Sequence, residues 1–365
     1  MSNQQPVLFI TGATGFLGGA TVAHLLASDL RCRIVALVRG EDAGDCELRL
    51  KRSLARFDMK YCQSLPSNLE ILQGDLMHTE WRNDPKLADL THVLHVAANT
   101  SFGRSSHIRK TNIEGALAVA NAVRDHKLVR YIHVGTAHIS GVGAPPVVTE
   151  DMYPSETAEH LVPYTQSKAE AEMLLMAEAN HLPLVIARPS IIVGHTKLGC
   201  GPSGSIFWVS RAVDKLGLIT WDPENKMDVI AVDYAAAALS HLLMAPTLKY
   251  DRYHISAGPE RSITWNEGAS DFARVMGGPA DRRYRQVPFE QITREVVAEA
   301  LGERHARHMM KALELYYQFC GVNVVFDNQR LVSEGFPAPE KPGQYLQTCI
   351  DTSPEDIYEQ MLSDF

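Results

Sequence analysis

The first half of the chain alternates short apolar runs with amphipathic stretches of helical length. Six runs have the length and continuous hydrophobicity of strands that are buried on both faces of a parallel sheet: residues 7–11, 33–38, 69–73, 92–97, 131–135 and 184–188. Helical patterns lie between them, at residues 16–28, 45–58, 108–127 and 164–180. This alternation predicts an α/β fold with a doubly wound parallel sheet and right-handed crossovers. Ligands of such sheets bind at the carboxyl ends of the strands.

The first strand leads directly into a glycine-rich turn and a helix, in VLFITGATGFLGG. Glycines in such a turn permit a tight bend, close approach of the backbone to a pyrophosphate, and close packing of helix on sheet. The helix N-terminus adds free N–H groups and a positive dipole. A turn without a ligand is the alternative, but the strand–turn–helix context favours a Rossmann dinucleotide site. Its expected contacts are Gly12, Thr14, Gly15, Phe16, Leu17 and Gly18.

The second strand ends in a cation, where a chain that binds NAD would carry an acid. In ALVRG, Arg39 occupies the position from which a carboxylate would hold the ribose 2′-hydroxyl. A guanidinium at this place suits the 2′-phosphate of NADP, and Arg49 on the following helix offers a second contact. A solvated cation is the alternative for Arg39. The sequence therefore predicts NADPH as the cofactor.

The ends of later strands supply the other expected cofactor contacts. The third strand ends at Asp75, which can reach the adenine. The fourth ends in VAANTSF, where small residues would let a cofactor lie against the backbone. The contacts expected at these strand ends and after the sixth strand are Asp75, Leu76, Ala97, Ala98, Asn99, Pro189, Ser190 and Ile191.

A tyrosine and a lysine stand four residues apart in VPYTQSK, so Tyr164 and Lys168 would share one helix face. The preceding strand ends near Thr136. The topology thus brings a hydroxyl, a phenol and an ammonium to the expected cofactor crevice. We expect Lys168 and the oxidised nicotinamide to lower the pKa of Tyr164 from its usual value of about 10, which makes the phenol a usable acid or base. Lys168 is also expected to bind the nicotinamide ribose, and Thr136 the substrate carbonyl.

Two further features favour structural roles. Asn112 lies in the helical stretch 108–127, and we expect it to brace the helix near the active site or to hold a loop. His305 and His308 have the spacing of metal ligands on a helix, but no third ligand accompanies them. We therefore expect a solvated helix face there and no metal site.

Composition argues against several classes of protein. The net charge of −8 provides no basic field for nucleic acid, and no apolar run is long enough to span a bilayer. The N-terminus lacks the basic region of a secretory signal, and the six scattered cysteines fit a reducing compartment. These observations predict a cytoplasmic protein and leave its oligomeric state open.

Several motifs occur in the order seen in the thioester reductase-like branch of the extended short-chain dehydrogenases. They include ITGATGFLGG, HVLHVAANTSF, YIHVGTAHISG, PYTQSKAEAEMLL and ARPSIIVGHTKLG, and the resemblance covers about residues 5–260. The charged insert after LVRG resembles this branch more than the sugar epimerases. The branch contains fatty acyl-CoA reductases, terminal reductase domains of nonribosomal peptide synthetases, and the reductase domain of carboxylic acid reductases.

The resemblance implies NADPH-dependent reduction of an acyl thioester to an aldehyde, with Thr136, Tyr164 and Lys168 as the catalytic residues. Whether reduction continues to the alcohol stays open. The acyl group would arrive on CoA or on a separate carrier protein. Gly135 departs from the pattern, because many relatives have serine there. Three alternatives remain: a short-chain dehydrogenase acting on a ketone or hydroxyl, a sugar-nucleotide epimerase, and a non-enzymatic NADP sensor.

The pattern changes after residue 188, where a stretch rich in glycine and proline begins. A strand and a helix return at residues 228–243, and from about residue 258 the chain is mainly helical and polar. We expect an NADP-binding Rossmann domain over residues 1–199 and 226–257, and a substrate-binding lid over residues 200–225 and 258–365. One hypothesis places Phe207, Trp208 and Val209 along an acyl channel of this lid; the alternative makes them core residues.

Overall fold

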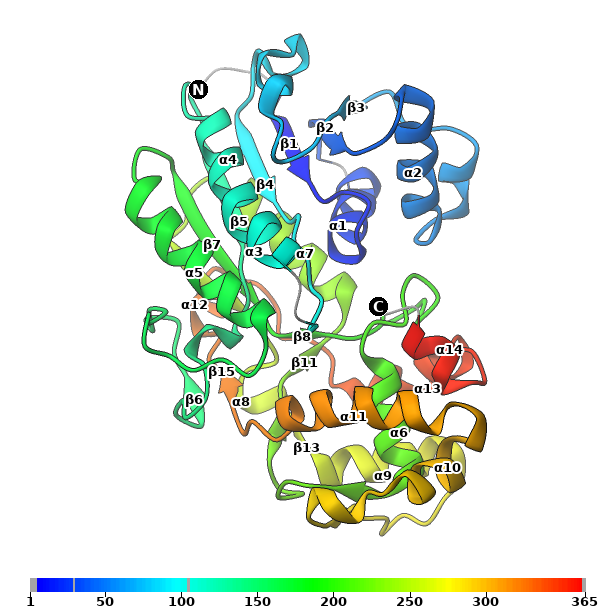
Figure 1. Ribbon diagram of the computed structural model, residues 1–365. Coiled ribbons are helices and arrows are strands. Elements are labelled where there is room, and N and C mark those ends of the chain that lie inside the picture. Colours follow the sequence, from blue (N-terminus) through cyan, green and yellow to red (C-terminus); the bar gives the residue numbers. More distant parts are fainter. Residues whose placement is uncertain (1–4, 29, 104–105, 363–365) are drawn as a thin grey trace.

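A seven-stranded sheet lies at the centre of the computed structural model, which describes residues 5–28, 30–103 and 106–362. Its order is β3-β2-β1-β4-β5-β7-β12, and all neighbouring strands are parallel. The strands are β1 (Val7–Thr11), β2 (Arg33–Val38), β3 (Leu69–Gln73), β4 (His92–His95), β5 (Arg130–Val134), β7 (Leu184–Pro189) and β12 (Arg252–Ile255). Helices cover both faces, so the expected doubly wound α/β fold is confirmed (Figure 1).

The expected helices are present, with shifted boundaries. They are α1 (Phe16–Ala27), α2 (Ala43–Ala55), α5 (Pro163–Glu178) and α7 (Val232–Met244). The stretch 108–127 differs, because it consists of α3 (Ser106–Arg109), a π-helical turn (Lys110–Glu114) and α4 (Gly115–Ala122). π-Helical turns are rare and often mark functional sites.

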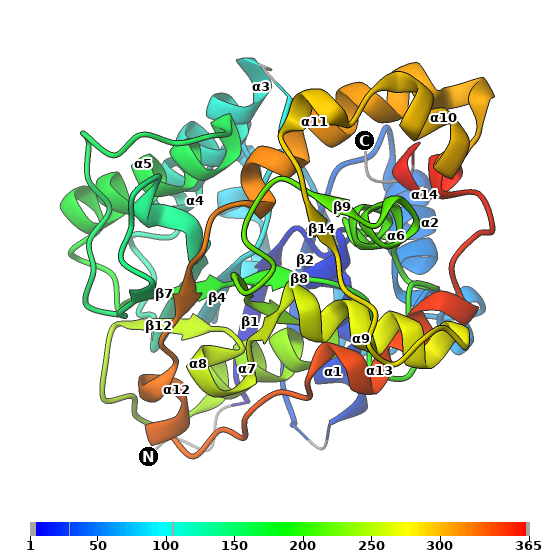
Figure 2. The ribbon, with the colours of Figure 1, turned by 90° about the horizontal axis from the view of Figure 1, so that it is seen from below.

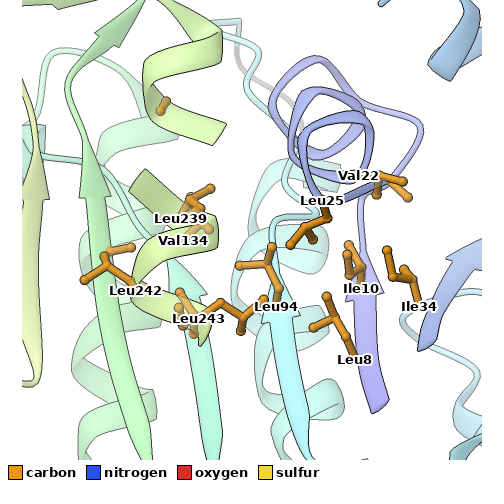
Figure 3. Packing of buried hydrophobic residues seen from close by; sticks show 14 of the residues in the cluster. Leu8, Ile10, Val22, Leu25, Ile34, Leu94, Val134, Leu239, Leu242 and Leu243 are labelled. Carbon is orange, nitrogen blue, oxygen red and sulfur yellow. The ribbon is translucent and has the colours of Figure 1, made fainter. Parts of the chain in front are cut away.

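Alternate residues of the central strands pack on opposite faces of the sheet. On one face, Leu8 and Ile10 of β1 pack in the same cluster as Leu239 of α7 (Figure 3). On the other face, Phe9 packs in the same cluster as Leu175 of α5. This two-sided burial explains why the strands read as continuous apolar runs and not as an alternating pattern.

The seventh strand, β12, is not predicted by the sequence pattern. Its four residues, RYHI, include two polar side chains, although all four are buried. Tertiary contacts satisfy the strand: the His254 backbone N–H donates to Glu150 at 2.9 Å, and the His254 ring hydrogen-bonds the Asp327 carbonyl at 2.8 Å. Polar side chains and partners far away in the sequence hold this strand, so it lacks the run of apolar residues from which strands are predicted.

The remaining helices form a second region at the carboxyl edge of the sheet (Figures 1 and 2). Its main helices are α6 (Phe207–Leu216), α9 (Trp265–Met276), α10 (Arg294–Leu301), α11 (Ala306–Cys320), α13 (Pro342–Asp351) and α14 (Ile357–Leu362). Two-residue strands connect and brace it: β8 (Ile191–Ile192), β9 (Leu218–Ile219), β10 (Lys226–Met227), β11 (Val229–Ile230), β13 (Ile263–Thr264) and β14 (Arg285–Gln286). No helix among the described residues has the length and hydropathy to cross a membrane.

Part of the C-terminal segment returns to the sheet. After α11, β15 (Val325–Phe326) pairs with β6 (Val147–Val148), and α12 (Gln329–Ser333) contributes Leu331 to the core under the sheet. A short helix, α8 (Gly258–Arg261), precedes the helical region. The expected division into a Rossmann domain and a lid stays a prediction, and the structure adds that residues 325–333 pack on the sheet side.

Trp208 belongs to the hydrophobic core of the helical region. Its side chain is fully buried, and its ring meets that of Tyr316 edge-on at a centroid distance of 5.0 Å. Val209 lies in the same core, while Phe207 belongs to a neighbouring cluster with Phe272. The channel hypothesis is therefore wrong for Trp208 and Val209, and the core alternative is correct.

Replacing Trp208 by alanine should lower the free energy of unfolding by about 3–5 kcal/mol, because a large buried ring is lost and a cavity remains. Urea unfolding at equilibrium measures this. Leu48→Ala is the control, since Leu48 is 46% exposed and should change stability by at most about 0.5 kcal/mol. A loss below about 1 kcal/mol for Trp208→Ala would contradict the assignment to the core.

Candidate active site

A cavity of about 810 Å³ opens at the carboxyl ends of β1, β4, β5 and β7. This is the edge where doubly wound sheets bind ligands. Every residue expected from the sequence to bind a cofactor or to catalyse lines it: Gly12, Thr14, Gly15, Phe16, Leu17, Gly18, Arg39, Arg49, Asp75, Leu76, Ala97, Ala98, Asn99, Thr136, Tyr164, Lys168, Pro189, Ser190 and Ile191. The structure thus brings the glycine loop and the Tyr164–Lys168 pair to one space.

Two glycines of the loop, Gly12 and Gly18, leave no room for a side chain. Gly12 has φ +78°, and a Cβ there would lie 2.6 Å from the backbone nitrogen of Ala97. A Cβ at Gly18 would overlap the Gly12 carbonyl oxygen. Gly15 is the N-cap of α1, so the free N–H groups of that helix face the cavity end of the loop. Backbone this exposed, at a helix N-terminus, fits a pyrophosphate.

Two cations lie at the β2 end of the cavity. The Arg39 side chain is 73% exposed, and its guanidinium lies 3.8 Å from the Asp75 carboxylate. Arg49 lies at the same distance from Asp45, one helical turn away on α2. Both pairs are long and solvent-exposed, so each holds its guanidinium weakly. Either cation is therefore available to an anionic group in the cavity.

The three expected catalytic side chains are buried or half-buried at the centre of the cavity. Tyr164 and Thr136 both line the cavity, and the Thr136 hydroxyl accepts from the His138 backbone N–H at 3.3 Å. The Lys168 side chain is buried, and its Nζ donates to the Val134 carbonyl at 2.6 Å. That bond attaches the ammonium to the end of β5, two residues before Thr136.

Burial sets the acidity of both titratable groups. It raises the pKa of Tyr164 to about 12, and the nearby Thr136 hydroxyl offsets part of that rise. The expected lowering of the Tyr164 pKa by Lys168 is therefore wrong for the protein chain alone. Burial also lowers the pKa of Lys168 to about 8, against an opposing effect of Glu172. At neutral pH the phenol is a proton donor and the lysine is still mostly charged.

Asn112 joins the end of β4 to the helix that carries the tyrosine. Its side chain accepts from the Asn99 backbone N–H at 2.7 Å and donates to the Asn99 carbonyl at 2.9 Å. It also donates to the Ser167 hydroxyl of α5 at 2.8 Å. Asn112 lies in the π-helical turn. It thus fills both roles expected of it, since it holds a loop and braces the site.

An aromatic wall, made of Phe102, Tyr316 and Phe319, lines the cavity beside Tyr164 and is not predicted by the sequence. The Phe102 ring lies nearly parallel to those of Tyr164 and Tyr316, at centroid distances of 6.4 and 4.8 Å. Phe319 meets Phe102 at 5.0 Å and His138 at 4.8 Å. Phe102 lies in the VAANTSF stretch, but Tyr316 and Phe319 have the ordinary spacing of a buried helix face.

Charged side chains are absent from the aromatic wall. Within the described part of the chain, the Asp, Lys and Arg side chains that line the cavity are Arg39, Arg49, Asp75 and Lys168. The rest of this end of the cavity is lined by the aromatic wall and by Ile206, which carry no charge. This end therefore suits an uncharged, apolar group.

The histidine pair of the C-terminal region makes aromatic contacts. His305 stacks on Tyr358 at 3.7 Å, and His308 Nδ1 lies 3.3 Å from the Tyr358 hydroxyl. Over residues 5–28, 30–103 and 106–362, no group of His, Cys, Asp or Glu side chains is arranged to hold a metal ion.

Comparison with known proteins identifies similar sequences and a similar fold. Residues 10–239 match the family described as "Male sterility protein". The aldehyde reductase lnaA of Aspergillus flavus is 25% identical over 312 residues, which cover 79% of this chain and 29% of that protein. The nonribosomal peptide synthetase asaC of Aspergillus flavus is 29% identical over 260 residues, covering 66% of this chain and 25% of that protein. This chain thus spans less than a third of either relative.

A solved structure with the same fold is the terminal R domain from the myxalamid PKS-NRPS biosynthetic pathway. The TM-score is 0.76 at 19% identity, and the match covers 96% of this chain and 91% of that domain. The likeness extends over the helical region as well as the sheet, so the whole described architecture recurs in that domain.

Proposed function

The chain belongs to the male sterility protein family, and we propose that it reduces an acyl thioester to an aldehyde with NADPH. Membership confirms the resemblance to the thioester reductase-like extended short-chain dehydrogenases and makes the chain an NAD(P)-dependent oxidoreductase. One observation carries the proposal. Thr136, Tyr164 and Lys168 line the same cavity as the glycine loop, beside an aromatic wall without charge.

The glycine loop and the two arginines support a dinucleotide with a 2′-phosphate. Gly12, Gly15 and Gly18 would hold the pyrophosphate, and Arg39 and Arg49 would pair with the additional phosphate. A chain selecting NAD would more often carry an acid at the position of Arg39.

Thr136 and Tyr164 would hold the thioester carbonyl oxygen. Both side chains line the cavity, and Thr136 affects the pKa of Tyr164, so a carbonyl oxygen near both could accept from the two hydroxyls. Bound NADPH would supply a hydride to the carbonyl carbon. The two hydroxyls would stabilise the negative charge that develops on the oxygen, and the buried Lys168 ammonium would add a nearby positive charge. Because the pKa of Tyr164 is about 12, the phenol stays protonated and able to donate at neutral pH.

Product formation needs a leaving group, and the thioester provides it. When the carbonyl reforms, the carbon–sulfur bond breaks, the thiolate departs and the aldehyde remains. The thiol would belong to CoA or to a separate carrier protein. The names of the relatives, a nonribosomal peptide synthetase and a terminal R domain, favour the carrier.

The aromatic wall argues against a sugar nucleotide as substrate. A diphosphate needs cations or backbone donors, and the described residues around Phe102, Tyr316 and Phe319 supply no lysine or arginine. A ketone or alcohol substrate would use the same three catalytic residues, so only the substrate distinguishes that alternative.

A panel of substrates tests the proposal. The purified chain with NADPH should oxidise the cofactor in the presence of acyl-CoA or acyl-pantetheine thioesters and release free thiol, measured with a thiol reagent. One thiol for each NADPH means that reduction stops at the aldehyde; one thiol for every two means that it continues to the alcohol. NADPH oxidation with ketones, and none with thioesters, would contradict the proposal.

Tyr164→Phe should lower kcat by about 10²–10⁴-fold, because the proton-donating hydroxyl is removed while the ring remains. NADPH affinity, measured by the fluorescence of the bound cofactor, should stay near wild type. Tyr153→Phe is a matched control, since Tyr153 is 58% exposed and does not line the cavity. Near-normal turnover by Tyr164→Phe would remove the tyrosine from the mechanism.

Arg39→Asp should raise the KM for NADPH by about 10–100-fold, because it replaces a charge-assisted partner of the phosphate by a repelling carboxylate. The KM for NADH should fall or stay constant. Arg52→Asp, an exposed substitution on α2 away from the cavity, should leave both constants unchanged. An unaltered KM for NADPH in Arg39→Asp would show that Arg39 does not contact the cofactor.

A further inference from the structure

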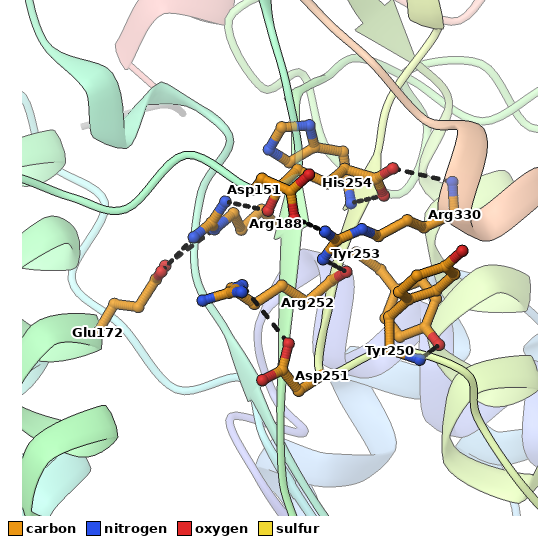
Figure 4. A network of polar contacts seen from close by, with 10 residues as sticks. Asp151, Glu172, Arg188, Tyr250, Asp251, Arg252, Tyr253, His254 and Arg330 are labelled. Atoms are coloured by element: carbon orange, nitrogen blue, oxygen red, sulfur yellow. Dashed lines mark hydrogen bonds and ion pairs between the residues drawn. The ribbon is translucent and has the colours of Figure 1, made fainter.

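A buried ion pair next to Lys168 has no part in the mechanism proposed above. Glu172 of α5 and Arg188 of β7 both have fully buried side chains. Arg188 Nε donates to Glu172 Oε2 at 3.1 Å, and its NH2 group donates to Oε1. In Figure 4 this contact lies at one end of a polar network. The network continues through Glu150 to the backbone N–H groups of His254 and Arg330.

The pair packs behind the strand end that carries Thr136. A Cβ added to Gly135 would lie 3.5 Å from Glu172 Oε2 and 3.7 Å from Arg188 Cγ. Gly135 separates Thr136 from Val134, and the Val134 carbonyl accepts the hydrogen bond from Lys168. The carboxylate therefore lies close to Gly135, the one residue between Val134, which accepts the lysine hydrogen bond, and Thr136.

Helical spacing places the carboxylate one turn beyond the lysine. Tyr164, Lys168 and Glu172 follow one another at intervals of four on α5, so they share a face of the helix. Glu172 acts against the effect of burial and raises the pKa of Lys168. An ammonium in a dry site needs such a countercharge to stay protonated near neutral pH.

Stability alone is a weak explanation for the pair. Taking two charges out of water is costly, and replacing a buried ion pair by apolar residues is often neutral or stabilising. Arg188 is also held on its far side, where its NH1 group donates to the Glu150 carbonyl at 3.4 Å. The arrangement fixes where the carboxylate lies, which matters if a neighbouring charge depends on it.

We propose that Glu172, held in place by Arg188, is a positioning residue that keeps Lys168 charged and fixes the end of β5 at Thr136. The inference rests on the proposed function only in taking Lys168 to act on the cofactor and on Tyr164.

Other groups near Lys168 do not change charge between pH 6 and 9. His95 of β4 and His133 of β5 are buried beside the lysine; burial lowers the pKa of His95 to about 3 and that of His133 well below its usual value. Both rings are therefore neutral in this range. Tyr164 stays protonated, because its pKa is about 12. The Arg188 guanidinium is paired with Glu172.

Glu172→Gln keeps the shape of the side chain and removes its charge. Lys168 acts when protonated, so activity falls as the pH rises through its pKa. Removing the carboxylate lowers that pKa, so the upper limb of the pH profile of kcat/KM should move to lower pH by about 1 unit. NADPH affinity, measured without substrate, should show the same displacement of its upper limb.

Further variants separate the effect of the charge from that of the structure. Glu170→Gln is the matched control: Glu170 is on the same helix but pairs with the exposed Arg109, and its loss should move neither profile. Glu172→Asp retains the charge and should keep the upper limb nearer to wild type than Glu172→Gln does. If Glu172→Gln fails to fold, the double variant Glu172→Gln/Arg188→Met replaces it, because it does not leave the buried Arg188 guanidinium without its carboxylate partner.

A folded Glu172→Gln, or the double variant in its place, with both profiles as in wild type would overturn the inference and reduce the pair to a structural contact. A displaced limb supports it. NADPH affinity keeps the two proposals apart. The wild type could fail to reduce thioesters while Glu172→Gln still shifts the pH profile of NADPH affinity. That result would support the role of Glu172 and contradict only the proposed function.

Discussion

Parallel pairing of the central strands decides where every part of the site lies. Thr11 of β1 pairs with His95 of β4, His95 with His133 of β5, and Val134 with Ala187 of β7. The strands therefore end at nearly the same level, and the loops that follow meet at one edge. The glycine loop, the small residues after β4, Thr136 and the segment after β7 come together for this reason, although they span nearly half of the chain.

Burial then determines what these side chains can do. The same loss of solvent raises the pKa of Tyr164 to about 12 and lowers that of Lys168 to about 8, because it disfavours the charged form of each. The effects leave a neutral donor beside a cation that is close to losing its proton. A phenol in this condition suits the stabilisation of a new oxyanion better than the removal of a proton.

Local spacing made much of the fold and of the site predictable. The strand–glycine–helix opening and the Tyr164–Lys168 interval each occupy one short segment, and the structure places both at the cavity. The aromatic wall was beyond such reasoning, since Tyr316 and Phe319 follow a helical spacing shared by core residues. The opposite error occurred at Trp208. An apolar run suggested an acyl channel, but the side chain lies in the hydrophobic core. The direction in which the pKa of Tyr164 shifts depends on its burial, which the spacing of residues in the sequence does not reveal.

The path of the chain between the sheet and the helical region has a mechanical consequence. It enters through the segment before α6, returns at β11, leaves again after β12, and comes back once more at β15 before α13 and α14. Several connections thus join this region to the sheet. We therefore expect the mouth of the cavity to widen by small sliding displacements shared among these connections, as in shear motion. A substrate on a long flexible arm could be admitted by such sliding without the helical region ever swinging away from the sheet.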